Sequence, residues 1–141
     1  CRFSGRCWCV YVAGTELVHP YVPVLCIVVE ASFLMSGNEI TVALQEKLNI
    51  IFLVMNDQHL GMVKHGQRLN KSADIANTLP NISYALMASA MGIMSHTIET
   101  ADDLMKLDTD KICARNGPTL LDIRIDAEEV PPIATRLKGM K

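Results

Sequence analysis

The sequence has no hydrophobic run near the ~20 residues that a membrane-spanning helix needs. Its apolar runs at Val24–Val29 and Ile50–Met55 hold six residues each. It also lacks an excess of positive charge: 13 basic residues stand against 15 acidic ones, for a net charge of −2. The sequence therefore lacks the excess of basic residues that attracts the phosphate backbone of a nucleic acid. The start shows no ordered basic, apolar and small-residue stretches of a secretory signal. These absences predict a cytoplasmic protein that neither spans a membrane nor binds nucleic acid.

Cysteine is present, but not in the pattern of a metal site. Cys1, Cys7 and Cys9 crowd the start of the chain, yet there is no Cys-x-x-Cys pair and no histidine at the usual spacing. We therefore assign these three no metal. Cys26 lies in an apolar run and Cys113 late in a predicted helix, so we interpret both as buried thiols. The odd total of five favours a reducing compartment.

Short β-branched runs alternate along the chain with apolar residues at helical spacing. Continuous apolar runs predict strands buried on both faces at 23–29 and 49–55, and a final strand is predicted at 119–125. The short segment 95–99 is a further candidate strand. Helical periodicity predicts helices at 36–48, 81–91 and 100–115, and polar composition predicts a long loop at 66–80. This alternation predicts an α/β fold, a three-layer sandwich whose mostly parallel sheet has helices on both faces.

Acidic residues directly follow two of the predicted strands, Glu30 after the first and Asp57 shortly after the second. In parallel α/β sheets, ligands bind at the carboxyl ends of the strands. If these two strands are neighbours, the two carboxylates meet there and offer the oxygen ligands that magnesium or calcium prefers. The alternative is that both are solvated loop charges, as acidic residues at strand ends commonly are.

Two motifs at these positions resemble a known family. Ala31–Met35 (ASFLM), with Asn38-Glu39 behind it, and Met55–Val63 (MNDQHLGMV) are similar to motifs of the thiamine-diphosphate-binding domain of the acetolactate synthase family. That family carries Gly-Asp-Gly/Ala-Ser-Phe and, one helix further on, Asn-Asn-Gln-His-Leu-Gly-Met-Val. The resemblance implies a thiamine-diphosphate-binding fold over residues 21–141, preceded by a divergent or truncated segment over 1–20.

The resemblance also implies a cofactor site. Carried over position by position, Mg²⁺ would be held by the side chains of Glu30 and Asp57 and by the backbone carbonyl of His59. The diphosphate would face the backbone at the amino end of the following helix, where free amides favour anions. The residues implied at thiamine diphosphate are Glu30, Ala31, Ser32, Met35, Asp57, Gly61 and Met62.

Several positions depart from the family pattern. Val29 replaces a glycine, Glu30 an aspartate and Asp57 an asparagine. Magnesium demands near-ideal geometry, so an extra methylene at Glu30 and an extra charge at Asp57 predict weakened cofactor binding. Gly66 stands where acetolactate-forming members have tryptophan, which leaves the substrate open. We interpret the adjacent Lys64-His65 pair as solvated loop residues, with contact to an anionic substrate as the alternative.

The resemblance implies decarboxylation of a small 2-oxo acid such as pyruvate, then carboligation, with the cofactor as electron sink. Such a protein would be a lyase or transferase of branched-chain amino acid biosynthesis and a homo-oligomer. In the family, a glutamate on a separate pyrimidine-binding domain activates the cofactor. We therefore expect the diphosphate/Mg half of such an enzyme, incomplete and inactive alone. The alternatives are a subunit of a split enzyme, completed by a separate pyrimidine-binding chain, and a non-catalytic remnant.

Overall fold

The computed structural model describes residues 23–129, which are built around one parallel four-stranded sheet. The strands are β1 (Val24–Val29), β2 (Ile50–Asn56), β3 (Met94–Ile98) and β4 (Thr119–Arg124), and their order across the sheet is β1-β2-β4-β3. All three neighbouring pairs are parallel. All four predicted strands are confirmed, each within one residue at either end. The segment 1–20, with its three cysteines, lies outside the described residues.

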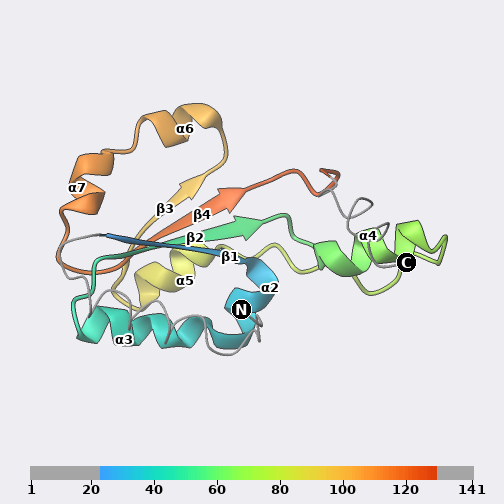
Figure 1. Ribbon diagram of the computed structural model, residues 1–141, viewed down its shortest axis with the longest axis horizontal. Coiled ribbons are helices and arrows are strands. Elements are labelled where there is room, and N and C mark those ends of the chain that lie inside the picture. The colour runs from blue at the N-terminus through green and yellow to red at the C-terminus, as the bar shows by residue number, and fades with distance from the viewer. Residues whose placement is uncertain (1–22, 130–141) are drawn as a thin grey trace, which may run out of the picture.

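Helices cover both faces of the sheet, which confirms the three-layer architecture (Figure 1). One layer holds α2 (Glu30–Ser36), the short 3₁₀ turn η1 (Gly37–Glu39), α3 (Ile40–Gln45) and α5 (Tyr84–Ala90). The other holds α6 (Ala101–Met105) and α7 (Thr109–Cys113), near β3. None of the described helices is long and apolar enough to cross a membrane.

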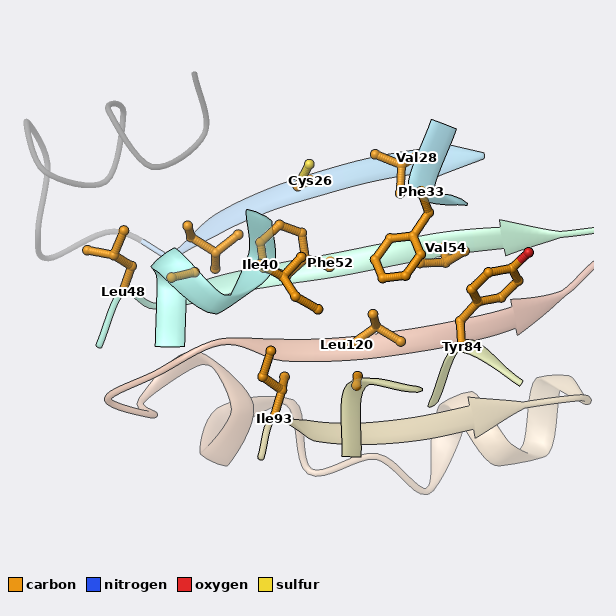
Figure 2. Close-up of a cluster of buried hydrophobic side chains, with 13 residues drawn as sticks. Cys26, Val28, Phe33, Ile40, Leu48, Phe52, Val54, Tyr84, Ile93 and Leu120 are labelled. Carbon is orange, nitrogen blue, oxygen red and sulfur yellow. The ribbon is translucent and has the colours of Figure 1, made fainter. Parts of the chain in front are cut away.

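The main hydrophobic core fills the space between the sheet and the layer that contains α2, α3 and α5 (Figure 2). Side chains alternate between the two faces of a strand, and the register places Cys26, Phe52 and Leu120 side by side on the face toward these helices. Phe33 of α2 packs edge-to-face on Tyr84 of α5, with ring centroids 5.4 Å apart. This contact joins the two helices beneath the carboxyl ends of the strands.

The opposite face of the sheet is covered only in part. Ile98, Leu121 and Ile112 are buried on the α6–α7 side. These two helices follow β3 at the far edge of the sheet and leave β1 uncovered. Leu25, Ile27 and Val29 are therefore exposed by 56, 64 and 56%. The prediction that the first strand is buried on both faces is wrong, because a continuous apolar run does not reveal that its strand lies at a sheet edge.

The helices differ more than the strands from the sequence prediction. Helix α2 begins at Glu30, where no helix was predicted. The single helix predicted at 100–115 is two, because Asp108 caps a new start by accepting from the Lys111 amide at 3.1 Å. Thr100 caps the first of these, α6, in a full capping box with Asp103. Cys26 is buried as predicted, but Cys113 is exposed.

Helix α4 (Gly61–Leu69) extends beyond the carboxyl ends of the strands and lies on neither face of the sheet (Figure 1). It occupies the first part of the loop predicted at 66–80. The segment after it folds back along the residues that precede α4: the Leu60 amide donates to the Asn77 carbonyl at 2.7 Å, and the Leu79 amide to the Gln58 carbonyl at 2.8 Å. The loop prediction therefore holds only beyond Leu69.

We expect Gly37→Ala to destabilise the fold. A Cβ at Gly37 would lie 2.8 Å from the ring of Phe33, which is itself only 1% exposed and has little room to move. Overpacking of this kind costs about 1–3 kcal/mol. Gly66→Ala in α4 is the matched control: nothing lies within 4 Å of the added atom, and alanine favours a helix by up to about 1 kcal/mol. Urea unfolding of both variants measures the difference, and equal stabilities would contradict the packing argument.

Candidate functional site

The first two strands are neighbours, and their ends are in register, with Val29 opposite Met55. Glu30 and Asp57 consequently meet at the carboxyl edge of the sheet. The Glu30 side chain is buried, with 1% exposed, and its carboxylate crosses to the loop after β2. Its Oε2 accepts from the Asp57 amide and its Oε1 from the His59 amide, both at 2.9 Å. Glu30 is therefore no solvated loop charge.

The loop after β2, residues 57–60, is also held by contacts of its own. The His59 amide donates to Asp57 Oδ1 at 2.9 Å, and His59 Nδ1 lies 2.8 Å from the Asp57 carbonyl oxygen. Gln58 has a φ of 59°, a left-handed conformation that costs energy in a residue other than glycine. A Cβ at Gly61 would come within 3.1 Å of Asp57 Oδ2, so glycine leaves that carboxylate its space.

Burial, together with the adjacent Asp57 carboxylate, raises the pKa of Glu30 to about 7, although the amides of Asp57 and His59 act in the opposite direction. The cause is that a charged carboxylate loses hydration inside the protein and lies next to a second negative charge. Glu30 therefore favours a proton, or a cation in its place.

A second buried carboxylate, that of Asp122, supports the site at the last residue of β2. Asp122 of β4 is 0% exposed. Its Oδ1 accepts from Asn56 Nδ2 at 2.9 Å, and its Oδ2 accepts from the Tyr84 amide at 2.9 Å. Asp122 thus ties the amino end of α5 to the last residue of β2, immediately before the site loop. The sequence analysis missed it, although an aspartate inside the apolar strand Thr119–Arg124 was a visible signal.

The structure brings together Glu30, Asp57 and His59, the three residues implied for the magnesium ion. Two carboxylates and the carbonyl of His59 are hard oxygen donors, which is the correct chemistry. In the part of the chain that the structure describes, no three His, Cys, Asp or Glu side chains are placed to hold a metal. A cation beside Glu30 and Asp57 would therefore need further oxygens from another source, such as a diphosphate.

The other residues implied at thiamine diphosphate are spread more widely. Ala31 and Ser32 form the first turn of α2 next to Glu30. Met35, on the same helix, is 67% exposed, and Met62, at the start of α4, is 86% exposed. The two methionines stand on the two helices that flank the Glu30–Asp57 pair, with their side chains at the surface.

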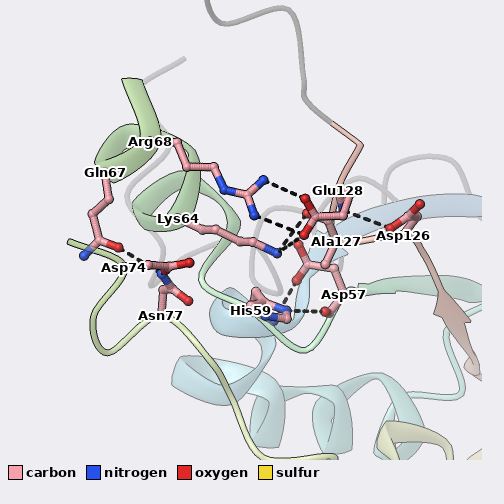
Figure 3. A network of polar contacts seen from close by, with 10 residues as sticks. All are labelled: Asp57, His59, Lys64, Gln67, Arg68, Asp74, Asn77, Asp126, Ala127 and Glu128. Carbon is pink, nitrogen blue, oxygen red and sulfur yellow. Dashed lines mark hydrogen bonds and ion pairs between the residues drawn. The ribbon is translucent and has the colours of Figure 1, made fainter. Parts of the chain in front are cut away.

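Helix α4 corrects the interpretation of Lys64 and His65, which are both 4% exposed rather than solvated in a loop. Lys64 Nζ donates to Glu128 Oε1 at 2.7 Å, and Arg68 Nη1 lies 2.7 Å from Glu128 Oε2 (Figure 3). Hydrogen bonds from Arg68 and Lys64 lower the pKa of Glu128 to about 2. The sequence analysis gave Glu128 no role, since ion pairs between distant segments leave no local pattern.

Fold and site together define a class of protein: a parallel α/β domain whose adjoining strand ends carry two acidic motifs. Residues 11–123 match the family described as thiamine pyrophosphate enzyme, C-terminal TPP binding domain. The chain belongs to this family, as a C-terminal TPP-binding domain of the acetolactate synthase-like type. The resemblance found in the sequence is thereby confirmed.

The relatives are much longer proteins. The acetolactate synthase large subunit of Haemophilus influenzae is 30% identical over 128 residues, which cover 87% of this chain and 22% of that protein. The large subunit from Buchnera aphidicola subsp. Schlechtendalia chinensis is 33% identical over 134 residues, covering 90% and 23%. Benzoylformate decarboxylase from Polynucleobacter necessarius superposes with a TM-score of 0.77 at 23% identity, over 87% of this chain and 23% of that one. This superposition confirms the fold. The chain spans less than a quarter of each relative.

We expect the stability of the metal-free protein to fall as the pH rises from about 5 to 8. The pKa of Glu30 is raised from 4.5 to about 7 in the folded protein. Its contribution is therefore complete below pH 4.5 and is lost as the pH rises through 7, by roughly 3 kcal/mol in total. Glu30→Gln should flatten this dependence, because groups common to both proteins cancel. Urea unfolding at several pH values with chelator present measures it, and parallel pH profiles for the two proteins would contradict the assignment.

Proposed function

We propose that this chain is the diphosphate- and magnesium-binding half of a thiamine-diphosphate-dependent enzyme, one that decarboxylates a small 2-oxo acid and ligates the product. The observation that carries the proposal is the meeting of Glu30 and Asp57, each within its own family motif, at the carboxyl edge of β1 and β2. This is the edge at which α/β sheets bind ligands. Family membership and fold agree with this function.

In this proposal the Glu30 and Asp57 carboxylates and the His59 carbonyl would hold Mg²⁺ in place of the proton on Glu30. The free amides of the first turn of α2, at Ala31 and Ser32, face the diphosphate. The bound cofactor supplies the electron sink for decarboxylation. The chain's own residues bind and orient it: Gly61 leaves the Asp57 carboxylate its place, and the ring-facing residues are Gly61, Met62 and Met35.

We propose that this binding is weak, and the structure gives a physical reason. Glu30 is long enough to reach the amides of Asp57 and His59, so a metal must share oxygens that already accept hydrogen bonds. Asp57 places a full negative charge beside a polyanionic ligand. Val29 adds a side chain where the family has none, directly before the first turn of α2.

We expect the triple variant Val29→Gly, Glu30→Asp, Asp57→Asn to bind thiamine diphosphate at least about tenfold more tightly than the unmodified chain when magnesium is present. A single charge-assisted hydrogen bond contributes ~1.5–3 kcal/mol, which is one to two decades in affinity. Isothermal titration calorimetry with and without magnesium measures the change.

The control is Asp110→Asn, which removes one exposed acidic charge on α7, in the other helical layer, and should leave the affinity unchanged. Tight binding by the unmodified chain, or no gain in the triple variant, would show that the site is misassigned.

We further propose that the 141-residue chain forms no acetolactate from pyruvate by itself, even with excess thiamine diphosphate and magnesium. The reason is that the family's activating glutamate belongs to the pyrimidine-binding domain, and no described residue has that position. A colorimetric acetolactate assay of the purified chain tests this, with a full-length acetolactate synthase as positive control. Product above background would overturn the half-site proposal.

Completion of the site requires a pyrimidine-binding domain, or a separate pyrimidine-binding chain as in a split enzyme. Independently of this, we propose that the chain forms a homo-oligomer, because Leu25, Ile27 and Val29 form an exposed apolar stripe of the kind that marks interfaces. A non-catalytic remnant is a further candidate. It is favoured by the hydrogen bond that the Glu30 carboxylate already accepts from the His59 backbone amide. A cytoplasmic location and a part in branched-chain amino acid biosynthesis belong to the proposal through the resemblance alone.

A further inference from the structure

Helix α4 starts where the site loop ends, yet it rests on neither face of the sheet (Figure 1). The beginning of the loop is fixed, because Asn56 is the last residue of β2 and its side chain bonds to the buried Asp122. The end of the loop is Leu60, whose amide donates to the Asn77 carbonyl, and α4 begins directly after it. The Gln67 side chain contacts the Ile75 backbone and the Asn77 side chain, which ties α4 to the segment that follows it.

One connection from α4 back to the sheet follows the segment after the helix, whose Ile82 carbonyl accepts from Asn56 and Arg124. A more direct connection runs through Glu128. Lys64 and Arg68 are one helical turn apart and so lie on the same face of α4. Glu128 bridges them: Oε1 accepts from Lys64 at 2.7 Å and from Arg68 Nη2 at 3.1 Å, and Oε2 accepts from Arg68 Nη1 at 2.7 Å (Figure 3). We call Lys64, Arg68 and Glu128 the α4 clamp.

The segment that carries Glu128 is itself attached to the sheet. The Ile125 amide donates to the Asn56 carbonyl at 3.1 Å, which continues the β2–β4 pairing by one residue. The Glu128 amide donates to Asp126 Oδ1 at 2.9 Å, which fixes the turn before the bridge. A continuous series of connections thus runs from β2 through the site loop and α4 to the α4 clamp, and from the clamp back to β4.

Within the α4 clamp, the buried Lys64 side chain depends on the carboxylate of Glu128. The Lys64 side chain is 5% exposed, while that of Glu128 is 61% exposed. Without the Glu128 carboxylate, the hydrogen-bond partner left to Lys64 Nζ among residues 23–129 is the Ala127 carbonyl at 3.3 Å. A buried ammonium group that loses its carboxylate moves toward water, because an unpaired buried charge is strongly destabilising. Such a movement of Lys64 would carry α4 with it.

We propose that Glu128 is a positioning residue for the cofactor half-site. Acting through Lys64 and Arg68, it holds α4 so that Gly61 and Met62 begin the helix at a fixed distance from the Glu30–Asp57 pair. The inference rests on the proposed function for what α4 is positioned against. It adds that the segment after β4 belongs to the site, although none of its residues matches either cofactor motif.

The test compares Glu128→Gln with Glu129→Gln, a matched control one residue further on whose side chain is exposed. Hydrogen exchange is followed by mass spectrometry on the cofactor-free chain, and thiamine diphosphate affinity by calorimetry with magnesium. We expect Glu128→Gln to speed exchange in α4 at least tenfold, to leave the four strands unchanged, and to weaken cofactor binding at least fivefold. Glu128→Asp, which keeps the charge, should recover part of both effects, and Glu129→Gln should show neither.

Unchanged exchange in α4, or equal acceleration throughout the strands, would overturn the proposal, since the clamp would then be either idle or part of general stability. Faster exchange in α4 with unchanged affinity would overturn it as well. The calorimetry is repeated in the Val29→Gly, Glu30→Asp, Asp57→Asn background. Absence of binding in both backgrounds would refute the proposed function, while the exchange data would still decide whether Glu128 holds α4.

Discussion

The buried carboxylate of Glu30 is the interaction on which the candidate site depends. It extends from the end of β1 to the loop after the neighbouring strand, where it accepts hydrogen bonds from the backbone amides of Asp57 and His59. A buried carboxylate without partners would be very costly, and loop amides without acceptors would cost about 1–3 kcal/mol each. Each side satisfies the other, so the loop after β2 has one preferred conformation, and α4 begins where that loop ends.

A second buried carboxylate holds backbone and side-chain groups in the same way on the other side of β2. Asp122 is buried in β4 and accepts the Tyr84 amide at the start of α5, as well as the side chain of Asn56. Two buried carboxylates therefore connect sheet, loop and helices at the carboxyl edge, and the Phe33–Tyr84 ring contact fills the space beneath them. The polar framework and the hydrophobic core meet at α5, so neither is independent of the other.

In the proposed site, support of the loop and binding of a metal ion compete for the same oxygen atoms. The oxygens that suit a metal ion are the oxygens that hold the loop, and burial beside Asp57 makes a proton a strong competitor for them. An aspartate at position 30 would be one methylene shorter and would pin the amides less fully. The same glutamate that, in our proposal, weakens metal binding thus supports the loop from within.

The sequence by itself determined the strands, the parallel α/β architecture and the family, because buried strands and contiguous motifs are local signals. It also predicted that Glu30 and Asp57 lie close together, since equivalent positions after neighbouring parallel strands meet, and the family resemblance added His59 to this pair. It did not reveal helix α2, the exposed face of β1 or the burial of Lys64, and it gave Asp122 and Glu128 no role. These features arise from contacts between residues far apart in the chain, such as Lys64 with Glu128 and Asp122 with Tyr84. Spacing along a sequence does not encode such contacts, so only the tertiary structure decided them.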